Sequence, residues 1–423
     1  MSVTGPAPRF RTVMAYAVLL GAFTGLFGLV YLIGVEGLVH WIWGDDWATE
    51  GWFSGSIWTF LIPVAAGLAI GLVYEVFDIP ARLPGFIEEL RAGEVEPRTA
   101  PGAVGIAVIS LISGPSLGPE APLGTAGGAA GTWLARRRNG DHETVRQMTF
   151  VGMSGAFGGL LSTPIGGPLL AYELEHEQSH DYYFTHLIPG VIAGAVSFGV
   201  MWPVIGAPFE GLLEIPRGDF RSWMLLAGVG LGVVAALAAL VVGKTMVWLV
   251  DRMRPLDSRP VLRGLAGGVL VGAIAYVMPL TLFSGQHAIP VLLDGYQGIG
   301  VLALVAIALL KAAALGSSLG GGFFGGPIFP IFFIGVALGL AIHILIPAIP
   351  LALALGATMA ALGAAVALLP LSMAVLTAIM IQSGLEIFGA VVVASMTAYA
   401  IRIALTRRQQ AGDMQRSAAS EPV

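Results

Sequence analysis

The sequence predicts an all-α membrane protein that crosses the bilayer many times. Of its 423 residues, 56% are hydrophobic and only 11% are charged, and the mean hydropathy is +0.83. Soluble domains carry about 25% charged residues. Apolar stretches approaching the roughly 20 residues that span a bilayer recur along the whole chain. They are residues 16–32, 60–73, 225–242, 262–280, 301–315, 328–346 and 374–401.

Short clusters of arginine predict the orientation of these spans. Arg9 and Arg11 precede the first span, residues 136–138 follow a middle one, and Arg407 and Arg408 follow the last. Cytoplasmic loops carry an excess of arginine and lysine, so both termini are expected in the cytoplasm. The protein itself is expected in the plasma or inner membrane. Residues 1–11 are then a cytoplasmic N-terminus, and 406–423 a polar cytoplasmic tail expected to be disordered.

Composition also excludes several functions. The chain has no cysteine, so thiol chemistry and thiolate metal sites are excluded. A net charge of −5 with only short basic clusters argues against a nucleic-acid partner. The sequence contains neither a nucleotide-binding signature nor a cluster of metal-ligating residues. We therefore expect no cofactor, no bound nucleotide, no metal and no enzymatic activity.

Two similar segments about 200 residues apart predict an internal repeat. "GPSLGPEAPLG" begins at Gly114 and "GSSLGGGFFGGPIFP" begins at Gly316. Both run G-x-S-L-G, then a proline-containing break, then an apolar helix rich in small residues. Inverted repeats in transporters place such breaks in corresponding positions, where helix N-termini meet near the midplane. The predicted repeats are residues 12–210 and 211–405.

The first break surrounds a single carboxylate, Glu120, with prolines and glycines. Because proline suits the first turn of a helix, a helix is expected to start beside Glu120 and run to Leu134. Free amides and the positive end of the helix dipole favour an anion there. Glu120 can itself occupy that site and leave it when protonated, which would make it a gate. The alternative is that Glu120 only caps the helix.

The second break offers the same arrangement from the other half. Gly325 and Gly326 allow the backbone to approach an ion closely. The amides of Ile328 and Phe329 are the predicted donors, whereas Pro327 has no N–H to donate.

Three segments together resemble the CLC family of chloride channels and proton-coupled transporters. "LGPEAP" at 117–122 resembles the family's Gly-Arg-Glu-Gly-Pro motif, and "GPIFP" at 326–330 is similar to its Gly-x-Phe-x-Pro motif. The stretch 152–175 resembles a third family segment that ends in glutamate. The resemblance covers about residues 12–405. It implies about 18 helical segments in two inverted halves with broken helices, and a homodimer with one anion pore in each subunit.

The resemblance also implies roles for individual residues. Glu120 matches the gating glutamate of the family. The residues matched to the anion site are Gly118, Ala121, Pro122, Gly326, Ile328 and Phe329. A register shifted by one glycine would move the second loop's roles to residues 323–327.

Several positions depart from the family pattern. Ala81 replaces an anion-coordinating serine, Pro119 replaces an arginine, and Pro327 removes a loop amide. The family's terminal tyrosine has no counterpart, Tyr399 being the nearest tyrosine. Each missing charge-assisted hydrogen bond is worth about 1.5–3 kcal/mol, so weaker anion binding is expected.

The predicted proton pathway is incomplete. Glu173 matches the first of two family glutamates, Leu174 takes the place of the second, and Glu175 follows. A helix turns about 100° per residue, so Glu175 and residue 174 face different directions. The alternative is that Glu173 and Glu175 are solvated residues at a helix end and take no part in proton transfer. Passive conduction and proton exchange both stay open.

Two further features concern buried charge and the membrane interface. Lys311 lies inside an apolar stretch. Three roles are open for it: it adds positive potential for an anion, it pairs with Glu386, or its ammonium group extends to the membrane interface. The tryptophans at 41, 43, 47, 52 and 58 predict an interfacial belt.

The predicted function is transport of chloride or a similar small anion through a pore gated by Glu120, as a channel or as an anion/proton exchanger. The alternative from another class is an intramembrane hydrolase that uses Ser116, or Ser318 of the repeated motif, as nucleophile.

Overall fold

The computed structural model is all-helical, as predicted. It describes residues 7–44, 55–77, 79–174, 182–206, 213, 215, 220–382 and 385–420. Within these ranges no strand forms, and one isolated antiparallel bridge joins Gly118 and Gly326. Eight helices in the described part are long and apolar enough to cross a membrane.

In the first half of the chain, the described residues form eight α-helices and one π-helical turn. They are α1 (Ala7–Trp43), α2 (Ile57–Val76), α3 (Phe86–Ala92), α4 (Ala100–Ile112), α5 (Glu120–Arg137), α6 (His142–Leu160), α7 (Gly166–Leu174), η1 (Tyr183–Leu187) and α8 (Ile188–Ile205).

The described part of the second half adds eight α-helices and two 3₁₀ turns. They are α9 (Trp223–Met253), η2 (Arg254–Leu256), α10 (Pro260–Val277), η3 (Pro279–Thr281), α11 (Ala288–Ile299), α12 (Val301–Gly321), α13 (Ile328–Leu345), α14 (Leu351–Ala367), α15 (Pro370–Ile381) and α16 (Leu385–Ser420).

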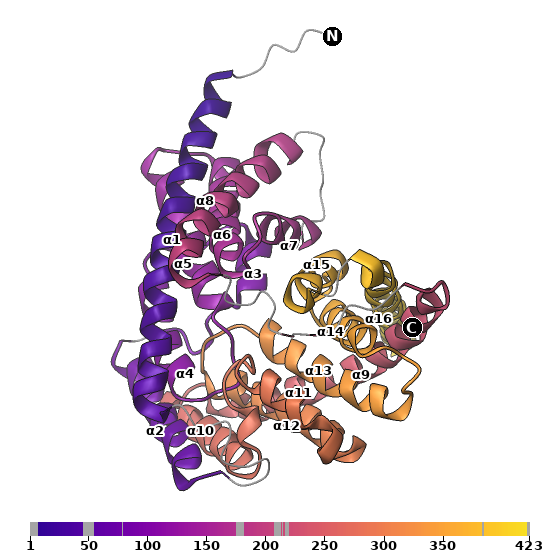
Figure 1. Ribbon diagram of the computed structural model, residues 1–423. Helices are drawn as coiled ribbons and strands as arrows, with labels where there is room; N and C mark the ends of the chain where they lie inside the picture. The colour runs from indigo at the N-terminus through magenta and orange to yellow at the C-terminus, as the bar shows by residue number, and fades with distance from the viewer. Residues whose placement is uncertain are drawn as a thin grey trace.

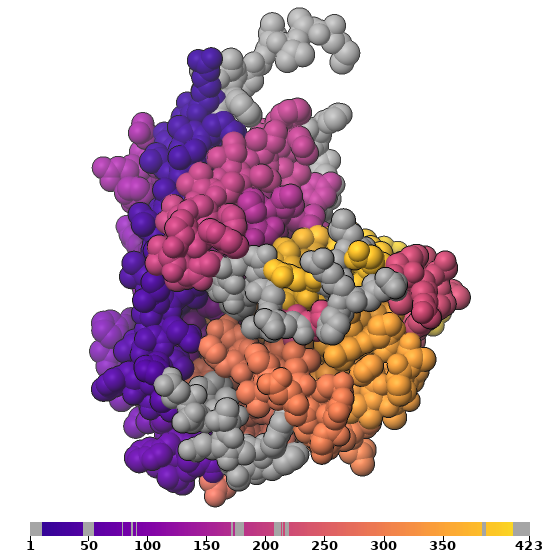
Figure 2. Space-filling model, viewed as in Figure 1, coloured from indigo at the N-terminus to yellow at the C-terminus, as the bar shows by residue number. Residues whose placement is uncertain are grey.

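The two halves lie side by side around a buried centre. In Figure 1, α1 runs along one edge of the molecule beside α5, α6 and α8, and α9, α13, α14 and α16 lie on the other side. Figure 2 shows α1 exposed along that edge over most of its length. α13 is buried against other helices along most of its length, and α14 along nearly all of it. Helices that face only other helices need no polar face, so their residues are apolar all round.

One predicted span was wrong and one was missed. Residues 374–401 form two helices, because the chain takes a left-handed conformation at Gln382 (φ 49°) between α15 and α16. The span at Tyr183–Ile205 was not anticipated. The last helix continues through 406–420, where a disordered tail was expected. The expected repeat boundary at 211–220 lies mostly outside the described residues.

Glycines bring α2 and α10 into backbone contact. A Cβ added at Gly264 would lie 2.1 Å from the carbonyl oxygen of Gly67, and one at Gly67 would lie 2.1 Å from that of Gly264. The contact is therefore reciprocal, and neither position has room for a methyl group. Small residues at such crossings are the usual basis of close helix packing in membranes.

We predict that Gly264→Ala destabilises the protein by about 1–3 kcal/mol, because the new methyl group forces α2 and α10 apart. The matched control is Gly230→Ala on α9, where an added Cβ meets nothing within 4 Å. The control should be neutral or stabilising by up to about 1 kcal/mol from helix propensity. The apparent unfolding temperature in detergent measures both, and equal values would contradict the prediction.

Candidate functional site

The N-termini of α5 and α13 meet at the centre of the protein. α5 begins at Glu120 after the loop that follows α4, and α13 begins at Ile328 after the loop that follows α12. Pro119 and Pro327 occupy the N-cap positions of the two helices. The amide of Gly118 donates to the carbonyl of Gly326, and the amide of Gly326 donates back, both at 2.8 Å. The two breaks predicted from the sequence are thus joined directly to each other.

The carboxylate of Glu120 lies at the start of α13. Its Oε1 accepts a hydrogen bond from the amide of Ile328 at 2.7 Å. The backbone of Phe329 and the residue's own amide also hydrogen-bond this carboxylate. Glu120 is 1% exposed, and its Oε2 has no hydrogen-bond partner within the described part of the chain. A negatively charged oxygen therefore occupies a set of free amides at a helix N-terminus, which is the arrangement that binds anions.

Glycines on both sides leave room for this carboxylate in its observed position. A Cβ at Gly326 would lie 2.1 Å from Cδ of Glu120, and one at Gly118 would lie 2.0 Å from Oε2. Any side chain at either position would overlap the carboxylate. Ala121 and Pro122 are buried in the first turn of α5. The six residues matched to the anion site, Gly118, Ala121, Pro122, Gly326, Ile328 and Phe329, therefore all belong to these two loops and first helical turns.

Serines from each half hold the loop of the other. Ser318 Oγ accepts the amide of Ser116 at 3.0 Å, and Ser110 Oγ accepts the amide of Phe324 at 3.0 Å. Each serine also donates to a carbonyl one turn earlier in its own helix, at 2.8 Å. Ser318 belongs to the repeated motif, whereas nothing in the local sequence distinguishes Ser110. The Ser116 hydroxyl is buried without a partner in the described residues, so no base activates it as a nucleophile.

A buried tyrosine and arginine fix the flanks of the second loop. Tyr74 donates to the carbonyl of Gly322 at 3.1 Å, and Arg263 Nε donates to the carbonyl of Gly320 at 2.9 Å. Arg263 also donates to the carbonyl of Ala81, in the segment where the family serine is missing. That segment is therefore anchored through its backbone. No local sequence signal indicates these contacts, because they join residues from distant parts of the chain.

Lys311 is fully buried, so it neither extends to the interface nor pairs with Glu386. Its Nζ donates to the carbonyls of Thr281, Leu282 and Phe283 at 3.1, 3.1 and 2.8 Å. It also lies 4.8 Å from the centre of the Phe333 ring. Lys311 thereby ties α12 to the segment around η3 and to α13, while Glu386 is exposed to solvent.

Glu173, one of the two residues predicted for proton transfer, binds the start of another helix. Glu173 accepts hydrogen bonds from the amides of Leu371 and Ser372, both at 2.7 Å, and from the Ser372 hydroxyl at 2.5 Å. It therefore caps the N-terminus of α15 from α7. Glu175 lies outside the described residues. Of the five belt tryptophans, Trp41 and Trp58 are largely exposed, Trp43 donates to the carbonyl of Ile112, and Trp47 and Trp52 are not described.

Two cavities approach the Glu120 site from opposite sides. One, of about 470 Å³, is lined by Leu117 and Pro119 of the first loop, with Glu36 and His287 3.2 Å apart in its wall. The other, of about 70 Å³, is lined by Thr125 of α5 and Phe324 of the second loop.

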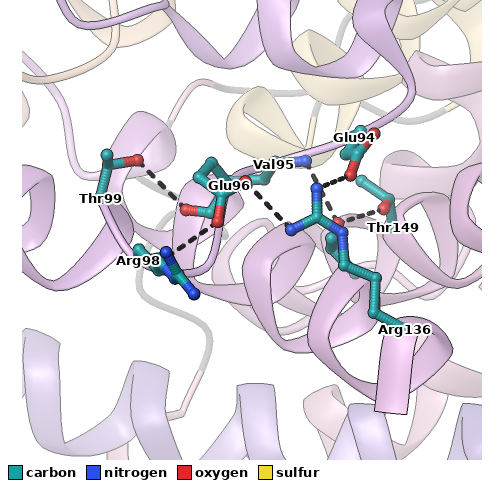
Figure 3. A network of polar contacts seen from close by, with 8 residues as sticks. Glu94, Val95, Glu96, Arg98, Thr99, Arg136 and Thr149 are labelled. Atoms are coloured by element: carbon teal, nitrogen blue, oxygen red, sulfur yellow. Dashed lines mark hydrogen bonds and ion pairs between the residues drawn. The ribbon is translucent and has the colours of Figure 1, made fainter. Parts of the chain in front are cut away.

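The second cavity lies toward the end of the molecule that carries Arg136–Arg138, which we call the arginine side. Arg136 pairs with Glu94 and Glu96, and both glutamates line this cavity (Figure 3). The N-terminal part of α1 is also at this end, because the Arg138 guanidinium lies 5.9 Å from the centre of the ring of Tyr16 on α1.

We predict that Ser318→Ala destabilises the protein by about 1–3 kcal/mol, because the buried amide of Ser116 loses its acceptor. Ser116→Ala is the matched control, since it removes a hydroxyl that has no partner. Thermal unfolding in detergent compares the two variants. A larger loss for Ser116→Ala would overturn this view of the loop contacts.

We further predict that Lys311→Met destabilises the protein by about 1–3 kcal/mol, because three buried carbonyls lose their donor. Lys244→Met on the exposed face of α9 is the control and should have little effect. Thermal unfolding in detergent measures both variants, and equal unfolding temperatures would refute the role assigned to Lys311.

Comparison with known proteins agrees with the resemblance seen in the motifs. The family model described as voltage gated chloride channel matches residues 66–402. A relative from Escherichia coli O139:H28, named "Putative ion-transport protein YfeO", is 28% identical over 359 residues, covering 82% of this chain and 83% of the relative. A relative of the same name from Shigella sonnei is 28% identical with the same coverage.

Two solved structures share the fold. A slow cyanobacterial Cl⁻/H⁺ antiporter matches with a TM-score of 0.75 at 20% identity, over 96% of this chain and 99% of the other. A CLC-type fluoride/proton antiporter matches with a TM-score of 0.78 at 16% identity, over 94% and 97% of the two chains. With its helical architecture, its paired loops and a family model covering most of its length, this chain belongs to the voltage-gated chloride channel (CLC) family.

Proposed function

We propose that the protein transports a small anion of the halide class across the membrane, with Glu120 as the gate. The observation that carries the proposal is the position of the Glu120 carboxylate, whose Oε1 is hydrogen-bonded to the amide of Ile328 at the start of α13. A carboxylate oxygen on free helix amides stands where a transported anion would bind. Chloride and fluoride are the candidate substrates, since the two structural neighbours carry these ions.

The gate follows from competition for one set of donors. While Glu120 is ionised, its oxygen holds the amides and excludes another anion by like-charge repulsion. Protonation removes that charge, the side chain leaves the amides, and an anion takes its place. Anions would reach the site through the cavity beside Pro119 on one side and through the cavity beside Phe324 on the other. The backbone amides of Ile328 and Phe329 and the loop around Gly118 would surround the bound ion.

The same gate serves two modes of transport. If the proton that releases Glu120 crosses the membrane, the protein exchanges anions for protons. If that proton returns to the side it came from, the protein is a channel. Glu173, at the contact of α7 with α15, is the described candidate for the proton route, and Glu175 is the second.

Assembly and orientation complete the proposal. We assign the arginine side to the cytoplasm, where positive residues are enriched, in the plasma or inner membrane of a cell. Arg138 lies close to Tyr16 of α1, which supports a cytoplasmic N-terminus. By its family, the protein is expected to work as a homodimer with a separate pore in each subunit, transporting ions and not catalysing a reaction.

We predict that Glu120→Gln abolishes the pH dependence that the gate imposes on anion flux and any proton movement coupled to it. Glutamine has the shape of a protonated glutamate and carries no charge that competes for the Ile328 amide. The measurement is the reversal potential of purified protein in bilayers under opposed anion and pH gradients. For an exchanger, the pH gradient displaces the wild-type value and leaves the Glu120→Gln value at the anion potential.

The control is Glu75→Gln, which neutralises an exposed carboxylate at the end of α2. It should behave as the wild-type protein. Absence of anion flux from the wild-type protein, for chloride and for fluoride alike, would overturn the proposed function.

A further inference from the structure

A second buried carboxylate, Glu89, lies on the short helix α3. The sequence "FIEEL" places two glutamates side by side, but Glu88 is exposed and Glu89 is only 6% exposed. Glu89 Oε2 accepts a hydrogen bond from the Thr125 hydroxyl of α5 at 2.7 Å. Carboxylates this deeply buried are unusual unless paired or functional. Neither the proposed gate nor the family motifs use Glu89.

Glu89 faces the small cavity on the arginine side of the anion site. The cavity has a volume of about 70 Å³ and is lined by Glu89, Thr125 and Phe324, with Glu94, Glu96 and Thr99 toward the surface. A water molecule takes up about 30 Å³ in the liquid, so the space holds a few waters or one small ion. Glu89 thus lies between the charged surface and the loop that carries Phe324.

Phe324 connects this cavity to the Glu120 site. Its amide is held by Ser110 Oγ, and the same loop reaches Gly326 two residues later, against the Glu120 carboxylate. Thr125 lies five residues after Glu120 on α5, toward the arginine side. An anion that approaches the Ile328 amide through this cavity therefore passes Glu89.

Among the residues that the structure describes, Glu89 forms no ion pair. Glu94 and Glu96 both pair with Arg136 at the surface, and one arginine neutralises only one of the two carboxylates (Figure 3). On α3 itself, Glu88 is close enough to repel Glu89.

The other helices packed against α3 place few further charged groups near Glu89. Arg146 of α6 lies against Gly93, just beyond the end of α3. Glu173 of α7 is bound to the start of α15. Thr125 is therefore the neighbour on α5 that stabilises the ionised form of Glu89.

We propose that Glu89 is a second, protonation-controlled gate for the transported anion, placed on the arginine side of the Glu120 site. The inference rests on the proposed transport function. In its ionised form Glu89 repels an anion from the cavity, because two like charges a few ångströms apart interact strongly in a buried setting. In its neutral form it leaves a passage lined by the Thr125 and Glu89 hydroxyl groups, which can donate hydrogen bonds to an anion.

The protonation of Glu89 falls in the physiological range. Burial raises the pKa of Glu89 to about 7, the hydrogen bond from Thr125 lowers it in part, and the nearby charge of Glu88 raises it further. A carboxyl group with a raised pKa is neutral below that pH and ionised above it. The gate therefore opens as the pH on the arginine side falls through about 7 and closes as it rises.

The experiment uses full-length protein in liposomes with Glu120→Gln as the background, which removes the first gate. Anion efflux is measured from about pH 5.5 to about pH 8.5, with chloride and with fluoride. We expect efflux to fall about tenfold per pH unit above the midpoint, as the neutral fraction of one group falls. Adding Glu89→Gln should make efflux high and independent of pH.

Two further variants test the mechanism without removing the carboxylate. Thr125→Val removes the hydrogen bond to ionised Glu89 and should move the midpoint to higher pH, whereas Thr125→Ser should restore it. Glu88→Gln is the matched control, an exposed carboxylate on the same helix, and should lower the midpoint slightly and keep the slope.

The outcomes separate this inference from the proposed function. If Glu120→Gln protein conducts anions and its pH slope is unchanged by Glu89→Gln, Glu89 is not a gate, although transport stands. An unchanged midpoint in folded Thr125→Val, checked by gel filtration, overturns the inference as well. Absence of flux in every variant, wild type included, refutes transport itself.

Discussion

The reciprocal hydrogen bonds between Gly118 and Gly326 are the constraint on which the rest of the site depends. They hold the chain just before α5 against the chain just before α13, so that two helix N-termini end beside each other. Each N-terminus carries unpaired amides and about half a positive charge. Two such ends in a buried place repel each other unless negative charge lies between them. Glu120 supplies that charge here, and an anion can replace it.

The sequence predicted this centre because its local signals are strong. Proline, glycine and a single glutamate inside apolar sequence indicate broken helices and a carboxylate at a helix start, and α5 does begin at Glu120. The contacts that hold the loops were not predictable. Ser110 resembles any small polar residue in a buried helix. Its hydroxyl nevertheless accepts a hydrogen bond from the amide of Phe324, 214 residues away. Such contacts follow from the tertiary arrangement alone.

The missed carboxylate has the same explanation, whereas the wrong span has a local one. Residues 374–401 are interrupted by Gln382, Ser383, Gly384 and Glu386. A polar break with a glycine is typical of a turn, and Gln382 adopts a left-handed conformation between α15 and α16. Glu88 and Glu89 look alike in sequence. Which of them is buried depends on how α3 packs against α5, where Thr125 provides the hydroxyl.

Where a side chain typical of the family is missing, contacts to the backbone hold the segment in place. Ala81 has no hydroxyl to offer an ion, and its carbonyl is held by Arg263, which also binds the carbonyl of Gly320. Arg263 therefore fixes the flanks of the site from outside it. The donors left for an anion are amides beyond Pro327, beginning with Ile328. With no cation or hydroxyl among the described donors, a site built from these few amides is expected to bind an anion weakly. In the proposed mechanism, exit is then easy, and the rate of passage depends mainly on the two carboxylates proposed to control entry.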